Sequence, residues 1–176
     1  MGEALSRLLQ AVRLDRDAFV WMDFNDRATA DGLIFVAVTR FLILLGSGWT
    51  ILGLVSTLGT IEIFVTSILN ALIFWLAYSG ITFAITKFLL GGSGSFAVFL
   101  RITGFAYPTL LLLIFTAQLD LPVYAALTIG FAWFIAIVTR GVTYEGDLPV
   151  PKALMAAVGG YVGWVVISSI LGRGAI

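Results

Sequence analysis

Four basic residues stand beside long apolar runs, where a positive charge could bind an anionic group. They are Arg40, Lys87, Arg101 and Arg140. At the cytoplasmic end of a membrane-spanning helix, such side chains usually follow the apolar surface until the charge reaches lipid headgroups. The alternative is a basic ring that binds lipid headgroups or a partner. We expect Arg101 to be the exception to simple snorkelling, because it lies between a Gly/Ser turn at 91–94 and a proline-containing run.

Other kinds of chemistry are not supported by the residue types present. The chain has no His and no Cys, which removes the neutral-pH proton shuttle, the common transition-metal ligands and a thiol nucleophile. No nucleophile–base pair or pair of catalytic carboxylates can be assembled. The GGSGS run lacks the preceding strand and following Lys of a phosphate-binding loop. We therefore predict no enzyme, no metal, no cofactor and no nucleic-acid partner.

The composition indicates an integral membrane protein. Of 176 residues, 60% are hydrophobic and 11% are charged, whereas soluble domains carry about 25% charged residues. Uncharged intervals of 18 to 24 residues separate successive charges, at 41–61, 63–86, 102–119, 121–139 and 153–172. A spanning helix needs about 20 apolar residues. We predict an all-α fold with five transmembrane helices, at about 33–58, 62–89, 97–119, 121–140 and 152–172.

Residues 1–31 form a cytoplasmic amphipathic segment ahead of the five-helix domain at 32–176. Its apolar positions recur at spacings of three and four: Leu5, Leu8, Leu9 and Val12. This pattern is typical of a short interfacial helix on the membrane, and a helix packed on its own bundle stays open as the alternative. The acidic run 23–31 lacks the central Gly and terminal Glu of a calcium loop, so we interpret it as a linker that caps the next helix.

The distribution of basic residues predicts the orientation. With five spans, nine of the ten basic residues lie on the side of the N-terminus, and only Arg173 lies opposite. The nine are Arg7, Arg13, Arg16, Arg27, Arg40, Lys87, Arg101, Arg140 and Lys152. The positive-inside rule then predicts a multi-pass protein of the inner membrane, with a cytoplasmic N-terminus and an external C-terminus.

Several residues inside the predicted spans are expected to serve helix contacts. Asn70 is the strongly polar group near the middle of the second span, and we expect its amide to bond to another helix. Pro108 should kink the third span, with Gly104 easing close approach. The mid-span Trp49, Trp75 and Trp164 should mark helix contacts, with a pigment or quinone neighbour as the alternative.

The fifth span carries two overlapping pairs of small residues four positions apart. They are Ala156 with Gly160, and Gly159 with Gly163. Such pairs let two helices approach closely in a membrane. Packing inside the monomer and packing against another subunit both stay open.

The segment around the 91–94 turn resembles a known family. In GGSGSFAVFLRITGFAYP, the turn is followed by Ser95-Phe96, Leu100-Arg101, Gly104-Phe105 and then Pro108. With the amphipathic start LLQAVRLDRDAF and the long second span, this looks like the glycine–aromatic–proline signature of the Ypt-interacting-protein (YIP) family of five-span membrane proteins. The resemblance covers nearly the whole chain and implies that fold and a membrane location. The acidic Leu-Tyr-Gly-Pro motif of eukaryotic members has no counterpart here, so the resemblance is to the short prokaryotic type and does not extend to Rab-GTPase binding.

Together these features predict a non-enzymatic integral membrane scaffold or accessory subunit. Its partners would be membrane lipids and other membrane-protein subunits or a second copy of the chain. The alternative is a channel or transporter for a small or lipid-like solute, which would use Asn70, the Pro108 kink and the basic edge. No paired broken helices are evident in the sequence, which counts against transport.

Overall fold

The computed structural model describes residues 2–52, 57–115 and 123–170, and every regular element in that part of the chain is a helix. The elements are α1 (Gly2–Val12), α2 (Arg16–Phe24), α3 (Arg27–Leu52), α4 (Thr57–Ala84), the π-helix η1 (Ile85–Leu89), α5 (Phe96–Ala106), the 3₁₀-helix η2 (Tyr107–Phe115), α6 (Val123–Glu145) and α7 (Val150–Ile170). The predicted all-α fold is confirmed for these residues.

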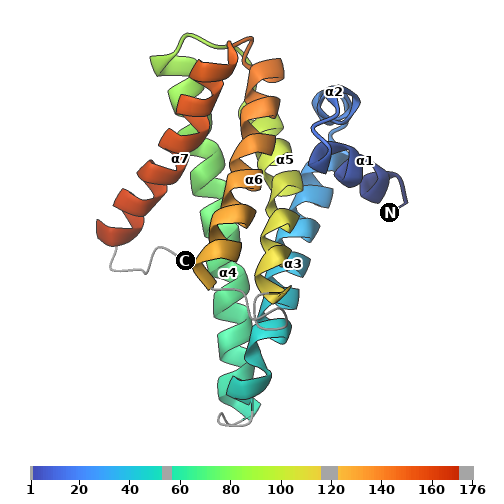
Figure 1. Cartoon of the computed structure of the whole chain (residues 1–176), viewed down its shortest axis with the longest axis vertical. Helices are drawn as coiled ribbons and strands as arrows, with labels where there is room; N and C mark the ends of the chain where they lie inside the picture. Colours follow the sequence, from blue (N-terminus) through green and yellow to red (C-terminus); the bar gives the residue numbers. More distant parts are fainter. Residues whose placement is uncertain (1, 53–56, 116–122, 171–176) are drawn as a thin grey trace.

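The helices from α3 to α7 form a bundle along the long axis of the molecule, whereas α1 and α2 lie across that axis at one end (Figure 1). Helix α3 packs on α4, α5 and η2, and α6 packs on η2, α5 and α7, while α4 also contacts α7. The core between them is aromatic, with Tyr78, Phe99, Phe105 and Phe134 fully or almost fully buried. The outward faces of the bundle are apolar too, as expected for helices that contact lipid rather than water.

Three helical segments are long and apolar enough to cross a membrane: Arg27–Gly46, Glu62–Leu89 and Val150–Ile170. They correspond to the first, second and fifth predicted spans, although the first begins six residues before the predicted 33. The third predicted span is a shorter apolar run, Phe96–Leu112, and most of the fourth lies in α6. The predicted ends and connections at 53–56, 116–122 and 171–172, and Arg173, lie outside the described residues.

The polar connections gather at one end of the bundle. The 90–95 loop contacts the turn between α6 and α7, where Ser93 N donates to Gly146 O at 3.0 Å. An added Cβ on Gly92 would lie 2.8 Å from that same oxygen, and Gly94 has a φ of +98°, so the small residues of this turn are needed for its packing. The N-terminal segment, the 87–101 loop and the 140–152 loop thus share one end of the molecule, as the sequence predicts.

At Gly104, α3 and α5 come into backbone contact. A Cβ added there would lie 2.7 Å from Gly32 Cα, so the predicted close approach is present. Four residues later, Pro108 has no N–H to donate to the Gly104 carbonyl. Helix α5 ends at Ala106, and the chain continues as the 3₁₀-helix η2, so Pro108 lies just after a change of helix type.

The small residues of α7 face α4 and the start of η1 in the same chain. Added Cβ atoms would lie 2.8 Å from Ile85 at Gly159 and 2.9 Å from Ile81 at Gly163, and the nearest atom to Gly160 belongs to Thr82. Ala156 is fully buried. Of the two alternatives left open by the sequence, packing inside the monomer is the one observed.

Two of the three mid-span tryptophans, Trp75 and Trp164, make contacts with other helices. Trp75 Nε1 in α4 donates to the Leu100 carbonyl of α5 at 2.9 Å, and the Trp164 ring lies edge-on to Phe74 with ring centroids 5.5 Å apart. The side chain of Trp49 lies outside the described part of the chain.

Candidate functional site

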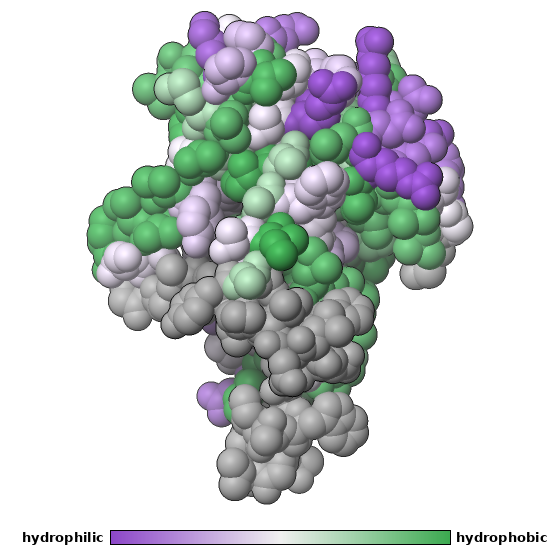
Figure 2. All heavy atoms as spheres, viewed as in Figure 1, coloured by the Kyte–Doolittle hydropathy of each residue, from purple (hydrophilic) through white to green (hydrophobic). Residues whose placement is uncertain are grey.

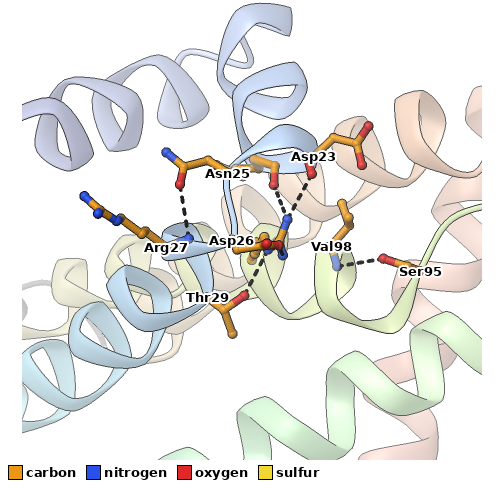
Figure 3. A network of polar contacts seen from close by, with 9 residues as sticks. Asp23, Asn25, Asp26, Arg27, Thr29, Ser95 and Val98 are labelled. Atoms are coloured by element: carbon orange, nitrogen blue, oxygen red, sulfur yellow. Dashed lines mark hydrogen bonds and ion pairs between the residues drawn. The ribbon is translucent and has the colours of Figure 1, made fainter.

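The guanidinium of Arg101 is the centre of a polar cluster at the edge of the bundle, and the arginine itself is only 5% exposed although Asp26 faces solvent. Its Nη1 donates to the carbonyl oxygens of Met22 and Asp23, at 2.8 and 3.0 Å. Its Nη2 donates to Asp26 Oδ1 at 2.6 Å, and its Nε donates to Thr29 Oγ1 at 2.9 Å (Figure 3). We call these five residues the Arg101 clamp.

Helix ends explain why a cation is stable there. The last turn of α2 presents carbonyl groups without helical partners and carries partial negative charge, which favours a cation. Helix α3 begins directly afterwards, with Asn25 Oδ1 accepting from Arg27 N at 3.1 Å (Figure 3). Helix α5 is itself started by Ser95, whose side chain accepts from Val98 N. The linker predicted at 23–31 is wrong in extent, because only Asn25 and Asp26 lie between α2 and α3, but its capping role is confirmed at Asn25.

The clamp holds the α1–α2 hairpin, residues 2–24, against the bundle. Trp133 Nε1 of α6 donates to the Val12 carbonyl at 3.0 Å, at the end of α1. The Trp21 ring lies 6.0 Å from the Phe105 ring of α5. The two helices are also tied to each other, because Trp21 Nε1 donates to Glu3 Oε1 at 3.0 Å.

Of the two alternatives for the amphipathic helix, packing on its own bundle is observed along one face, and another face is left exposed. Ala4 and Ala11 are buried against the rest of the chain, so α1 does pack on its own bundle. Leu5 and Leu9, one turn apart, are 54% and 59% exposed. An exposed apolar pair of this kind is the part of an amphipathic helix that enters a membrane interface.

Two acidic residues, Glu145 and Asp147, lie at the end of α6 and in the turn that follows it. Ser93 Oγ donates to the Glu145 carbonyl at 3.0 Å and to Asp147 Oδ2 at 3.3 Å. Partial burial, together with the negative charges of Asp23 and Asp147, raises the pKa of Glu145 from 4.5 to about 7, and the Arg101 guanidinium opposes this rise. Glu145 lies beyond the predicted fourth span, and it changes charge near neutral pH.

Replacing Glu145 with glutamine should make the protein less sensitive to alkaline pH. The raised pKa means that Glu145 contributes its full stability below about pH 4.5 and loses it as the pH rises through 7. Water screens this half-exposed group, so we expect E145Q to gain on the order of 1 kcal/mol at pH 8 and nearly nothing at pH 4. Thermal unfolding in detergent from pH 4 to 8 measures this, with the exposed Glu62→Gln as control. A gain at pH 8 no larger than that of the control would contradict it.

The other predicted basic residues are not in the clamp. The Arg140 guanidinium lies over the Tyr144 ring, 4.7 Å from its centroid, and Tyr144 also contacts Phe19 of the hairpin at 5.8 Å between ring centroids. Lys87 is exposed and lies 5.3 Å from the centroid of Phe83. Both remain available at the polar end of the bundle, where they could reach lipid headgroups.

Arg40 lies elsewhere, and the expectation that it shares one end of the bundle with Lys87, Arg101 and Arg140 is wrong. Its Nε donates to Ser67 Oγ of α4 at 2.7 Å. Along α4, Ser67 is 20 residues from Lys87 but only five from Glu62, which is about 30 Å and about 8 Å at 1.5 Å per residue. The reason is that α3 begins at Arg27, so Arg40 is 13 residues into that helix.

Asn70 is exposed on the outer face of α4. The predicted bond from its amide to another helix is not present among the described residues of this chain. Thr66, one turn earlier, is also exposed, whereas Tyr78, Thr82 and Thr86 in the later turns are buried. The polar positions of α4 therefore pass from the outside of the bundle to its core and do not line one path.

Sequence reasoning identified Arg101 but missed its partners. Two of the bonds go to backbone carbonyls of Met22 and Asp23, which carry no sequence signal. The acidic linker 23–31 is the signal that could have been used, because a lone arginine in an apolar run needs an acidic or carbonyl partner. Glu145 was missed because it owes its position to a turn between two helices.

Among the described residues, no group of three or more His, Cys, Asp or Glu side chains could hold a metal ion. The arrangement that the structure offers is therefore a cation held among carbonyls and carboxylates, with a fixed amphipathic hairpin beside it. Comparison of the chain with known protein families, curated proteins and solved structures gave no match.

Proposed function

We propose that this chain is a non-enzymatic integral membrane scaffold or accessory subunit, which organises a membrane or a membrane-protein complex. The observation that carries the proposal is the Arg101 clamp, in which a buried arginine ties an amphipathic hairpin to the bundle. Two bonds from the guanidinium attach the end of α2, and the other two hold Asp26 and Thr29 at the start of α3, so α1 presents Leu5 and Leu9 in a constant place. A fixed surface suits docking or lipid organisation. The resemblance to the YIP family agrees with this proposal and stays a prediction.

The membrane boundaries follow from the charges on α4. Glu62 and Lys87 are 25 residues apart, about 37 Å along the helix, which is enough to cross a hydrocarbon core of about 30 Å. We place the Lys87 end in the cytoplasm by the positive-inside rule. Hydrophilic residues gather towards this end on the side of the hairpin, whereas the opposite side is largely apolar (Figure 2). Arg40 then lies near the outer boundary, where its charge can reach headgroups.

Lipid is the first partner we propose. Leu5 and Leu9 supply apolar area beside Arg13 and Arg16, both of which are exposed. This combination favours the interface of a bilayer that contains anionic lipids. In the inner membrane the hairpin would therefore lie among the headgroups and upper acyl chains of the cytoplasmic leaflet.

The test is gentle extraction of the protein from native membranes, followed by measurement of the particle mass and of co-purifying polypeptides. A defined assembly larger than one chain supports the scaffold or accessory role. A lone monodisperse particle, with no stoichiometric partner, contradicts it and gives priority to transport or lipid handling.

One observation favours the alternative, a channel or transporter for a small or lipid-like solute. The hydroxyls of Thr82, Thr86 and Thr139 are buried without a hydrogen-bond partner in the described structure. Buried polar groups without partners suit contact with water or a solute. The outward position of Asn70 counts against this alternative. Solute flux into liposomes that is unchanged by Thr82→Val would leave the alternative without support.

A further inference from the structure

We propose that the outer face of α4 is the contact surface between two copies of this chain, with Asn70 at its centre. The inference rests on the proposed function and deepens it, because it names a second copy as the subunit partner. The surface, which we call the α4 seam, follows spacings of three and four along the helix: Ile63, Thr66, Asn70, Ile73, Ala77, Gly80 and Ala84.

The seam is available for a partner. Its first four residues are exposed and its last three are half-buried, whereas the core-facing Ser67, Ala71, Trp75 and Tyr78 are buried. A Cβ added to Gly80 would meet only the Phe96 ring edge, at 3.7 Å, which is ordinary van der Waals contact. The α4 helix therefore has a second face that this chain does not cover.

The spacing is that of a helix pair. Residues repeating every three and four positions, seven residues per two turns, keep one stripe of a helix against a partner helix. Towards the cytoplasmic end the seam carries Ala77, Gly80 and Ala84, and small residues let two membrane helices approach closely. No charged residue occurs between 63 and 86, so no like charges would face each other within the membrane.

Asn70 indicates that the occupant is a copy of the same helix. It lies eight residues from Glu62 and 17 from Lys87, about 12 and 25 Å along α4, and therefore within the proposed hydrocarbon core. An amide without a partner is costly there. Two copies with the same orientation in the membrane bring Asn70 opposite its counterpart, and a carboxamide carries both donors and an acceptor, so it complements itself. A single polar residue at such a position also fixes the register of a helix pair.

Cysteine crosslinking in native-like bilayers tests the pairing, and the chain has no cysteine of its own. Thr66→Cys places a thiol in the seam. The matched control is Val65→Cys, because Val65 is the adjacent residue, is 52% exposed and points about 100° away around the helix. We expect Thr66→Cys to form crosslinked dimers in vesicles of phosphatidylethanolamine and phosphatidylglycerol, and Val65→Cys to form few. Equal crosslinking of the two variants, or none, would overturn the inference.

A second variant separates the contribution of the Asn70 amide from nonspecific association of the helices. In the Thr66→Cys background, Asn70→Leu keeps the side chain similar in size and removes its hydrogen bonds. Bonds between membrane helices contribute about 1–2 kcal/mol in model peptides, so dimerisation should weaken about fivefold to thirtyfold, measured by dilution of the protein in lipid. Asn70→Leu that leaves dimerisation unchanged would overturn the role of Asn70. If a different polypeptide co-purifies and Thr66→Cys forms no dimers, self-pairing is overturned but the accessory role stands. A monomer without any partner would contradict both self-pairing and the accessory role.

Discussion

Arg101→Met should release the α1–α2 hairpin from the bundle while the membrane-spanning helices stay folded. Methionine fills much of the same volume but makes none of the four bonds that Arg101 donates. The loss of Arg101 leaves the buried Met22 carbonyl and the part-buried Asp23 carbonyl without their partner. Hydrogen bonds from a charged group contribute about 1.5–3 kcal/mol each, so the loss of the two that hold the end of α2 should cost about 3 kcal/mol.

Limited trypsin digestion measures the release, because Arg13 and Arg16 lie at the bend of the hairpin and are exposed. We expect cleavage in this region of Arg101→Met to be about 100-fold faster, as a 3 kcal/mol shift of a local opening equilibrium implies. Arg27→Met is the matched control, since it removes an exposed arginine at the start of α3. Equal cleavage rates for the two variants would contradict the role of the clamp.

Gly104→Ala should destabilise the bundle more than Gly130→Ala in α6. The added Cβ would lie 2.7 Å from Gly32 Cα and 3.1 Å from Gly32 C, and backbone atoms cannot turn aside as a flexible side chain can. Helices α3 and α5 would have to separate, and overpacking of this kind costs about 1–3 kcal/mol. We expect about 2 kcal/mol, measured by thermal or denaturant unfolding in detergent.

Gly130→Ala in α6 provides the comparison for this prediction. There the nearest atom to an added Cβ is the Thr109 carbonyl oxygen at 3.5 Å, which is ordinary contact. Both substitutions gain the same preference of alanine over glycine in a helix, so the difference between them isolates the contact with Gly32. Similar stabilities of the two variants would mean that the close approach of α3 and α5 is not required.

The helices were predictable because long uncharged runs can satisfy their backbone groups in lipid only as helices. The same reasoning misplaced Arg40, since it treated every charge as the end of a span. The residues that start α3, Asn25 and Arg27, are a better guide to its beginning, and they place Arg40 well inside the helix. Local capping signals therefore fix helix starts better than charge counting does.

The candidate site was predictable only in part. Arg101 was singled out because a lone charge between a turn and an apolar run is unusual. Its bonds reach residues 72 to 79 positions earlier in the chain, and no local pattern records which segment folds back on it. The outward position of Asn70 is likewise a property of how α4 is rotated in the bundle.

The distance along the chain between Arg101 and its partners also determines the order in which these parts come together during synthesis. Helices α1 to α4 leave the ribosome before Arg101 does, so the hairpin has no guanidinium to bind while the first two membrane-spanning segments insert. Domains form during synthesis from the N-terminus onwards. The nascent hairpin is therefore unanchored until α5 arrives and Arg101 fixes the N-terminal segment in place.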